Sequence, residues 1–479
     1  EMQRSLVGSE MCIRDRNKLF GSREFYHRVL AISVPIMVQN AITNFVSLLD
    51  NVMIGRVGTV EMSGVAIANQ LLFVFNMLVF GAIAGAGIFG AQFFGNRDMD
   101  GVRHTLRFKL MICLVLAAAC IGIFTAFGPQ LINLYLKGEG AVEDAEASLR
   151  YGLQYIKVMY IGMLPYAITQ AYAGTLRETG ETLLPMKAGI VAVLVNLTFN
   201  YILIFGHFGA PRMGVVGAAI ATVLSRFVEL AIVVSWAHRH AVRFPYITGL
   251  YRSLHIPGRL FRDILRRGTP LLVNEGLWAA GMAMLNQCYS LRSLDVVAAT
   301  NISSTIWNLF ACVYLALGSA ISIMVGQELG AGDFEKAKVT ARQTTAFSVA
   351  ISIGVGLLMA FVGTYFPLIY RATDTVRHLA TNFIRIGACL MPFTAMTNAL
   401  YFTLRAGGKT MVTFLFDSAF VWLINIPVAY VLSRYTAMPI LLLYACCQSL
   451  EIIKCIIGTV MVKKGIWINN IVADKKGEV

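Results

Sequence analysis

Charged residues are scarce in this chain. Asp, Glu, Lys and Arg make up 14% of its 479 residues, whereas 57% are hydrophobic and the mean hydropathy is +0.67. A soluble domain carries about 25% charged residues, so this composition excludes an ordinary soluble protein. Apolar runs of about 20 residues, long enough to cross the hydrocarbon core as helices, recur along the whole chain and predict a membrane protein.

Several chemical signatures are also missing. The nine cysteines include no CxxC pair, and the seven histidines fall in loops or at the ends of apolar runs, which argues against a disulfide framework, a zinc site and a histidine relay in the membrane. No P-loop is present, so this chain alone does not drive transport with ATP. No paired Asp or nucleophile with a base occurs in the apolar runs. We therefore expect no enzyme and no cofactor.

The apolar runs predict an all-α membrane protein of about twelve transmembrane helices in two six-helix lobes. In the first half the runs lie near residues 30–50, 65–90, 108–128, 152–173, 186–206 and 215–237. In the second half they lie near residues 264–288, 298–326, 344–366, 380–402, 411–432 and 438–461.

The two halves repeat one another. Residues 175–182 (TLRETGET) recur as residues 403–410 (TLRAGGKT), and Gly90-Ala91-Gln92 with Gly95 recurs in residues 325–330. Each pair is separated by about 230 residues, which is the signature of an internal repeat. Because each half has an even number of spans, both copies enter the membrane in the same direction. A pseudo-two-fold axis along the membrane normal is therefore expected.

The domain organisation follows from the repeat. We expect an N-terminal lobe at 17–237, a cytoplasmic linker at 238–262, a C-terminal lobe at 263–465 and a cytoplasmic tail at 466–479. Residues 1–16 contain no apolar segment typical of a signal peptide and resemble translated adapter sequence. We interpret them as a non-native leader, the alternative being a disordered native tail.

The net charge of +14 comes from basic residues in alternate loops, which is the positive-inside pattern of a multi-pass protein of the cell inner membrane with both termini in the cytoplasm. Basic residues that flank spans, rather than forming one face with aromatics, do not predict a nucleic-acid partner. The basic residues assigned to the cytoplasmic side are Arg97, Arg103, Arg107, Lys109, Arg239, Arg243, Arg252, Arg259, Arg262, Arg266, Arg267, Lys336, Lys338, Arg342, Lys463, Lys464, Lys475 and Lys476.

Asp50 is the strongest candidate for a functional residue, because an acid in an apolar span is costly to bury. Gln39, Asn40 and Asn44 precede it on the same predicted helix, and Asp50 lies close to the face that Asn40 and Asn44 share. Removal from water disfavours the charged form of a carboxylate, so Asp50 is suited to take up a proton or hold a cation. The alternative is an interfacial carboxylate in contact with water.

Glu275 occupies the place in the second copy that Asn40 occupies in the first. We expect it to face a cationic solute or a second proton, the alternative being a structural carboxylate satisfied by neighbouring polar groups. Asp417 opens the eleventh predicted span, where an acid favours a helix N-terminus, and is interpreted as a cap. Glu229 and Glu451 are interpreted as partners of basic residues three positions away, Arg226 and Lys454.

Pro35 lies in the first predicted span, where a proline removes a backbone hydrogen bond and permits a bend. We predict a conformational hinge there, the alternative being a tolerated proline near a helix start. Two rocking lobes would enclose a cavity at the midplane, where aromatic faces and a carboxylate suit a lipophilic cation. The residues predicted to line that cavity are Gln39, Asn40, Asn44, Tyr166, Gln170, Trp278, Asn286 and Asn398.

A family resemblance rests on the order of several motifs. Leu49-Asp50 with Gly55, the turn at Gln92, the repeated LRxxGxT segments and residues 196–200 (NLTFN) together resemble the multidrug and toxic compound extrusion (MATE) family. The resemblance implies a twelve-helix, two-lobed antiporter that exports cationic or amphipathic compounds in exchange for sodium ions or protons. It also implies that Asp50 takes part in coupling and that Asn196 and Thr222 belong to a polar cation site.

This chain departs from the family pattern at two places. Asn200 stands where some members carry an aspartate, and the tenth span has no carboxylate where another branch carries one. Glu275 resembles the glutamate of the seventh span in that branch. The coupling ion, sodium or proton, therefore stays open. We expect small-molecule cations and membrane lipid as partners and a monomeric protein; the alternative function is a lipid-linked oligosaccharide flippase of related architecture.

Overall fold

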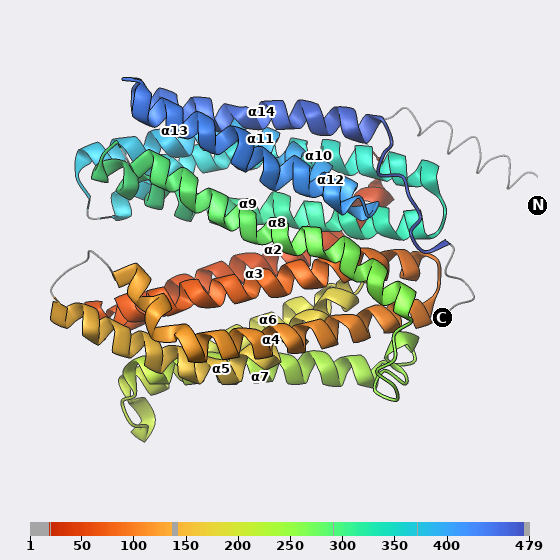
Figure 1. Ribbon diagram of the computed structural model, residues 1–479, viewed down its shortest axis with the longest axis horizontal. Coiled ribbons are helices and arrows are strands. Elements are labelled where there is room, and N and C mark those ends of the chain that lie inside the picture. Colours follow the sequence, from red (N-terminus) through yellow and green to blue (C-terminus); the bar gives the residue numbers. More distant parts are fainter. Residues whose placement is uncertain (1–18, 20, 137–141, 291, 371, 474–479) are drawn as a thin grey trace, which may run out of the picture. The chain divides into compact units, whose positions relative to one another are not determined.

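The computed structural model describes residue 19 and residues 21–136, 142–290, 292–370 and 372–473. All regular secondary structure in this described part of the chain is helical (Figure 1). The prediction of an all-α protein is confirmed. The predicted leader, residues 1–16, lies outside the described residues.

Six long helices form the first half of the chain, and each contains one predicted apolar run. Most of these helices extend past the apolar run at both ends, because helical hydrogen bonding continues into the polar residues that flank it. The helices are α2 (Arg23–Gly55), α3 (Thr59–Gly95), α4 (Met99–Leu136), α5 (Val142–Glu178), α6 (Leu183–Phe205) and α7 (Gly214–Arg239).

The second half contains the other six helical segments. One of them is interrupted by two π-helical turns, η4 (Leu415–Ala419) and η5 (Val421–Asn425), between α12 (Thr410–Phe414) and α13 (Ile426–Tyr435). The other five are α8 (Gly258–Ser290), α9 (Leu294–Gly330), α10 (Phe334–Tyr365), α11 (Asp374–Ala406) and α14 (Ile440–Lys463). The short 3₁₀ turns are η1 (His207–Gly209), η2 (Pro245–Ile247) and η3 (Phe366–Ile369).

Nine helical segments among the described residues are long and apolar enough to cross a membrane. Three other long helices, α2, α5 and α8, are not among these nine, and each carries charged residues near its start. In α8 these are four arginines and one aspartate within residues 259–267. The nine apolar segments make the chain a multi-pass membrane protein.

The described residues divide into two compact units, which we call unit 1 and unit 2. Unit 1 holds residues 19–37, 91–97 and 273–473. Unit 2 holds residues 38–90 and 98–272. Helices α2, α3 and α8 therefore contribute residues to both units, and the lobe boundaries proposed from the sequence stay a prediction.

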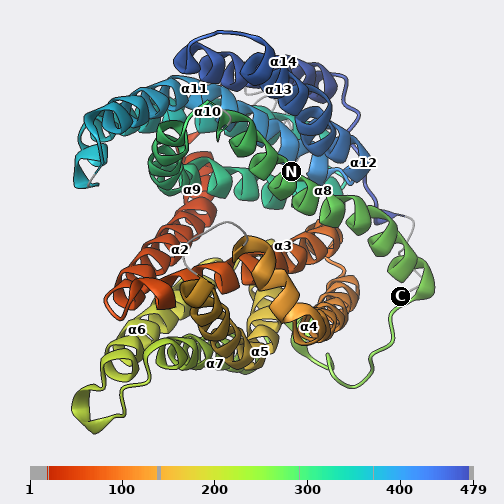
Figure 2. The same cartoon turned by 60° about the vertical axis from the view of Figure 1, so that its left-hand side comes forward.

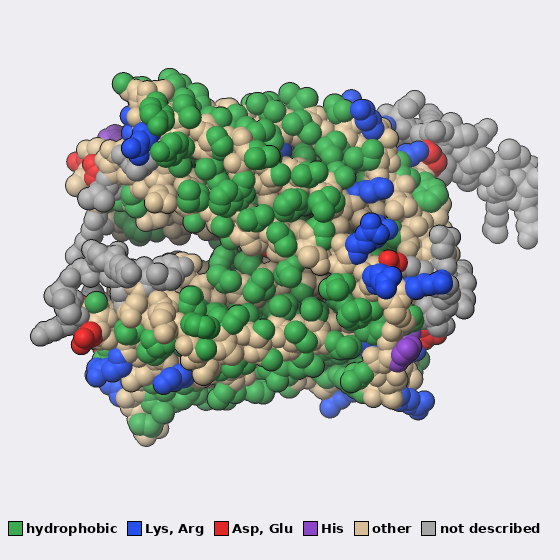
Figure 3. Space-filling model, viewed as in Figure 1, with side chains coloured by type: hydrophobic (Ala, Val, Ile, Leu, Met, Phe, Trp, Pro, Cys, Tyr) green, Lys and Arg blue, Asp and Glu red, His purple; other side chains and the backbone are tan. Residues whose placement is uncertain are grey.

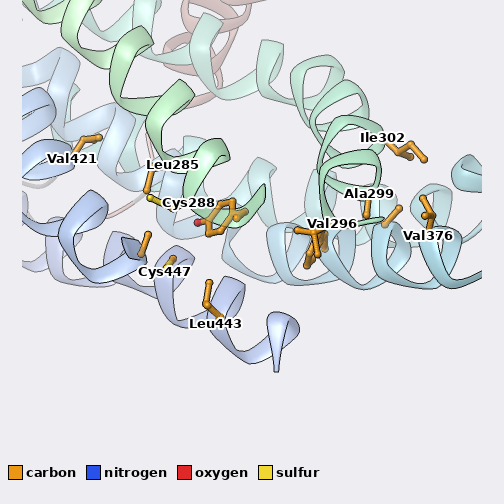
Figure 4. Close-up of a cluster of buried hydrophobic side chains, with 13 residues drawn as sticks. Leu285, Cys288, Val296, Ala299, Ile302, Val376, Val421, Leu443 and Cys447 are labelled. Carbon is orange, nitrogen blue, oxygen red and sulfur yellow. The ribbon is translucent and has the colours of Figure 1, made fainter. Parts of the chain in front are cut away.

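Unit 1 is built mainly from α9, α10, α11 and α14, with α11 packed against the other three. One buried cluster joins α8, α9, α11 and α14 through residues that include Leu285, Ala299, Val376 and Leu443 (Figure 4). Another cluster packs the first turns of α2 on α9, where Ile36 meets small and branched side chains. Because lipid tails are as apolar as these side chains, the clusters stabilise the helix bundle through van der Waals packing.

In unit 2 the helix α7 packs against α5 and α6, which Figures 1 and 2 both show as neighbours. Glycine permits the close approaches. A Cβ atom at Gly217 on α7 would lie 2.7 Å from the carbonyl oxygen of Leu203 on α6, and one at Gly85 on α3 would lie 2.3 Å from Cα of Gly268 on α8. Small residues at crossings let helices pack through backbone contacts in a membrane.

The exposed surface agrees with a lipid environment. In the face shown in Figure 3, hydrophobic side chains cover the middle of the helices of each unit, and Lys and Arg gather at helix ends. Two of the residues counted as loop cations are exceptions. Arg107 and Lys109 lie inside α4 and are buried, because each has polar partners within unit 2.

Candidate functional site

Asp50 lies near the end of α2, five residues before the last residue of that helix, Gly55. Its side chain is half-buried and accepts a hydrogen bond from Asn200 on α6, with 2.6 Å between Asn200 Nδ2 and Asp50 Oδ1. The two residues are 150 positions apart in the chain. The fold of unit 2 therefore brings together a carboxylate and an amide from two helices far apart in the sequence.

The amide chain continues from Asn200 through α6 to α7. Asn200 Nδ2 also donates to Asn196 Oδ1 at 3.1 Å, and Asn196 Nδ2 donates to Thr222 Oγ1 at 3.2 Å. The spacing of four residues puts both asparagines on one face of α6. The arrangement is a continuous line of four polar side chains from three helices, and Asn196 and Asn200 are almost fully buried.

Asn200 leaves one acceptor without a partner. Its Oδ1 atom is buried and makes no hydrogen bond to the described residues. A buried acceptor of this kind is uncommon and costs about 1–3 kcal/mol. Since Asp50 makes no ion pair with the described residues, the site offers one negative charge and a free amide oxygen. Oxygen ligands of this type suit a hard monovalent cation or a proton.

Tyr155 is a member of the site that the sequence analysis did not identify. It comes from α5 and is buried, and its hydroxyl group interacts with Thr222. It also interacts electrostatically with Asp50 and with Arg226. The sequence alone does not identify such a tyrosine as functional, because an aromatic residue in a long apolar run is equally expected to pack against other helices.

The residues predicted to line the cavity divide between the units. In unit 2, Arg177 Nη2 donates to Gln39 Oε1 at 2.5 Å, and the guanidinium of Arg226 lies 4.9 Å from the ring centre of Tyr166. Asn40 and Gln170 are half-buried, and Asn44 is exposed. Asn44 nevertheless takes part in a noncovalent interaction with another residue. The arrangement of these side chains as cavity lining stays a prediction.

The other three predicted lining residues belong to unit 1. Trp278 and Asn286 are exposed on α8. Asn398 lies on α11, where its buried Oδ1 makes no hydrogen bond to the described residues and points toward the position that a Cβ atom would occupy at Gly318 on α9. Its role as a substrate contact is likewise a prediction.

Pro35 lies inside α2, twelve residues after the first residue of the helix, Arg23. The alternative interpretation of a proline near a helix start is therefore wrong. A proline in the interior of a helix removes one hydrogen bond of the helix ladder. The hinge role predicted for Pro35 remains compatible with this position and stays a prediction.

Glu275 on α8 is half-buried and makes no hydrogen bond or ion pair within the described part of unit 1. Arg405 and Asp417 lie near enough for their charges to act on it. Its neighbour Asn274 does not bond to Glu275 but donates to Asp417 Oδ2 at 3.1 Å. The coupling role predicted for Glu275 stays a prediction.

Two predictions about ion pairs and caps were wrong. Asp417 is not a helix cap, because it lies in the π-helical turn η4 after α12 has already begun at Thr410. Lys454 does not pair with Glu451, three residues before it, but with Asp417 on another helical segment, at 2.6 Å. The sequence spacing favoured Glu451 as the partner of Lys454, whereas the packing of α14 places Lys454 against Asp417, which is distant in the sequence.

These features define a class of protein: an all-helical, multi-pass membrane protein in which a half-buried carboxylate, Asp50, accepts a hydrogen bond from an amide on another helix. A comparison with family models identifies the family. The model described as MatE matches residues 35–202 and again residues 271–431. The chain belongs to this family and is a MATE transporter. The two matches correspond to the two copies that the sequence repeat predicted.

Curated relatives cover nearly the whole chain. A protein of Thermotoga maritima named "Probable multidrug resistance protein NorM" is 24% identical over 420 residues, 87% of this chain and 88% of the relative. A Bacillus anthracis protein of the same name is 25% identical over 410 residues, 84% of this chain and 87% of the relative. "Probable multidrug resistance protein YoeA" of Bacillus subtilis is 23% identical over 412 residues, which are 85% of this chain and 87% of the relative.

Solved structures share the fold. The structure described as "Crystal structure of MATE in the straight conformation" has a TM-score of 0.82 and 19% identity, and the match covers 94% of this chain and 97% of that one. A mutant of the Vibrio cholerae MATE transporter VcmN also has a TM-score of 0.82, with 16% identity and 93% and 98% coverage. At these identities the likeness establishes the fold.

Proposed function

We propose that this protein is a secondary active exporter, in which cations entering through the site at Asp50 drive cationic or amphipathic small molecules out of the cell. The observation that carries the proposal is the line of side chains Asp50, Asn200, Asn196 and Thr222 within an apolar helix bundle. A single carboxylate there binds one proton or one sodium ion with charge neutralised. The names of the curated relatives support multidrug compounds as cargo.

The geometry supports a definite role for Asn200. With the site as described, its Nδ2 group donates to Asp50 and stabilises the negative carboxylate. A rotation of the side-chain amide would exchange Nδ2 for Oδ1, which has no partner among the described residues. Asn200 would then present an oxygen to a cation, or an acceptor to a protonated Asp50. The amide thus adapts to both charge states of the site.

Binding at Asp50 affects the conformational equilibrium only if the ion binds one state more tightly than another. The ligands come from α2, α6 and α7, so a bound ion ties the end of α2 to the other two helices. Pro35, fifteen residues earlier on α2, gives that helix a place to bend. We propose alternating access in which ion occupancy favours one shape of α2.

The orientation belongs to the same proposal. The basic linker between α7 and α8 lies on the cytoplasmic side of a cell membrane, as the positive-inside pattern indicates. The chain then has its N-terminus and its C-terminus in the cytoplasm. It acts as a monomer surrounded by lipid, without a metal or organic cofactor.

The test is efflux from proteoliposomes loaded with a fluorescent lipophilic cation. A sodium gradient and a proton gradient are imposed separately on the wild-type protein and on Asp50→Asn. Export that follows one gradient and is lost in Asp50→Asn is the expected result, and it identifies the ion. If no gradient drives export of any of several cations, the flippase alternative gains support. If Asp50→Asn exports normally, coupling moves to Glu275.

A further inference from the structure

Unit 1 contains a second buried carboxylate centre, which the proposed coupling mechanism does not use. Its centre is Asp417 in the π-helical turn η4, and Lys454 on α14 lies against it with 2.6 Å between Lys454 Nζ and Asp417 Oδ1. The side chain of Lys454 is 8% exposed and that of Asp417 is 17% exposed. The pair is thus largely removed from solvent and lies within apolar helical segments.

The second oxygen of Asp417 is also satisfied. Asn274 Nδ2 on α8 donates to Asp417 Oδ2 at 3.1 Å and lies 3.4 Å from the hydroxyl oxygen of Tyr401 on α11. Ser418 holds Asn274 in turn, since its backbone N–H donates to Asn274 Oδ1 at 3.3 Å and its hydroxyl lies 2.7 Å from the same atom. The centre is therefore a built site, with residues from four helical segments.

The π-helical turn explains how two adjacent residues serve the same site. A π turn widens the helix locally and shifts the faces on which neighbouring side chains lie. Asp417 bonds to α14 and α8, while Ser418 bonds to α8 alone. Phe416, the preceding residue, has its ring centre 5.4 Å from Lys454 Nζ, a distance at which the ring face attracts a cation. Phe416 and Asp417 thus contact the ammonium group of Lys454 directly, and Ser418 holds Asn274, which donates to Asp417.

The composition of this centre parallels that of the Asp50 site. Both have one central carboxylate and a side-chain amide that donates to it; a hydroxyl group follows, that of Ser418 on Asn274 directly and that of Thr222 through the second amide Asn196. The difference is the cation. Asp50 has no ion-pair partner among the described residues, whereas Asp417 holds the ammonium group of Lys454. A primary ammonium group carries the same single charge as a sodium ion.

From this contrast we infer that the Asp417 centre is a cation site that the chain fills with its own Lys454, so that, of these two carboxylates, only Asp50 is open to an external coupling ion. The second half of the inference rests on the proposed function, but the first half does not. Removal of Lys454 leaves Asp417 buried without its counter-ion, which is strongly destabilising. A small primary alkylammonium ion of matching shape should then bind in the space and restore the pair.

The experiment measures the thermal unfolding midpoint of the purified full-length protein at constant ionic strength, with propylammonium chloride replacing N-methylglucamine chloride. All variants carry Asp50→Asn, which removes the first site. Lys454→Ala should show a saturable rise in midpoint with propylammonium. Adding Asp417→Asn should abolish the rise. Glu451 also interacts electrostatically with Lys454, so a rise that survives Asp417→Asn overturns the inference.

If Lys454→Ala does not fold, a second measurement still tests the inference. Asp50→Asn with Lys454 intact should show no saturable stabilisation by sodium, lithium or propylammonium ions. Stabilisation by any of these that disappears with Asp417→Asn would show that an external cation reaches the centre, and it would overturn the inference. Neither measurement depends on transport, so a failed transport assay and a failed binding assay are distinguishable.

Discussion

Asn200 Nδ2 lies 2.6 Å from Asp50 Oδ1, and the buried oxygen of the same amide has no hydrogen-bond partner in the part of the chain that the structure describes. The amide nitrogen of Asn200 therefore donates to the carboxylate, and its amide oxygen is available to bind a cation or to accept a hydrogen bond. This relationship makes Asn200 the residue whose substitution should report most directly on ion binding.

We expect Asn200→Asp to make the protein depend on cations for stability. The change replaces the hydrogen bond to Asp50 by repulsion between two carboxylates, and two such groups in one site cannot both stay charged without a counter-ion. The thermal unfolding midpoint should fall in N-methylglucamine chloride and rise more steeply with sodium than in the wild type. Asn200→Ala is the control, since it removes the amide without adding charge. Equal sodium dependence in both variants would contradict the expectation.

The buried ion pair between Lys109 and Glu178 should be necessary for the stability of unit 2. Lys109 Nζ lies 2.6 Å and 2.7 Å from the two carboxylate oxygens and 2.9 Å from Thr175 Oγ1, and its side chain is fully buried. Lys109→Met should cost about 3–5 kcal/mol, because it leaves a buried carboxylate without its partner. Denaturant unfolding followed by tryptophan fluorescence measures the loss.

The double variant Lys109→Met with Glu178→Gln should recover most of that loss, because no uncompensated charge remains. Lys338→Met serves as the matched control. Its partner Glu335 lies 2.7 Å away but the pair is exposed, so the change should cost less than about 1 kcal/mol. A loss for Lys109→Met no larger than for this control would contradict the importance of the buried pair.

Arg107 should hold the linker between α7 and α8 on unit 2. Its guanidinium donates to three backbone carbonyl groups, those of Gly249, Leu250 and His255, at 2.9, 2.9 and 3.1 Å. Arg107→Met should free the segment and increase tryptic cleavage at Arg252 several-fold, because a carbonyl without its donor favours water. Arg262→Met, at an exposed position on α8, is the control and should not change the cleavage rate at Arg252.

Pro35→Ala should reduce gradient-driven export and leave expression and the unfolding midpoint intact. Alanine restores the hydrogen bond that the proline removes and favours a straight helix. The control is Pro129→Ala in α4, another proline inside a helix, which should leave export unchanged. Equal export by wild type and Pro35→Ala would exclude the bend as a step in transport.

Much of the fold could be predicted from the sequence because lipid imposes simple rules. Apolar runs of sufficient length must be helices, since backbone groups have no other partners in hydrocarbon. The runs located the long helices, and the segments around residues 175 and 403 revealed the duplication. What the runs could not show was the π-helical turn at Asp417, because the i to i+5 pattern depends on partners in α8 and α14.

The residues of the candidate site were likewise only partly predictable from the sequence. Asp50 could be identified from its residue type and its position alone, because a carboxylate in an apolar span is expensive. Asn196, Asn200 and Thr222 followed from the family resemblance. Tyr155 could not be found, since nothing in the sequence distinguishes it from a packing aromatic. Lys454 was assigned a neighbour on its own helix, because only local spacing is visible in one chain.

The sequence by itself determined that this chain is a duplicated bundle of membrane helices and that Asp50 is its least easily explained residue. Hydrophobicity and residue spacing are local properties, so the sequence states them directly. The tertiary structure decided which polar groups meet. It joined Asp50 to Asn200 and Asp417 to Lys454, because the partner of a buried charge is set by helix packing, which brings together residues far apart in the chain.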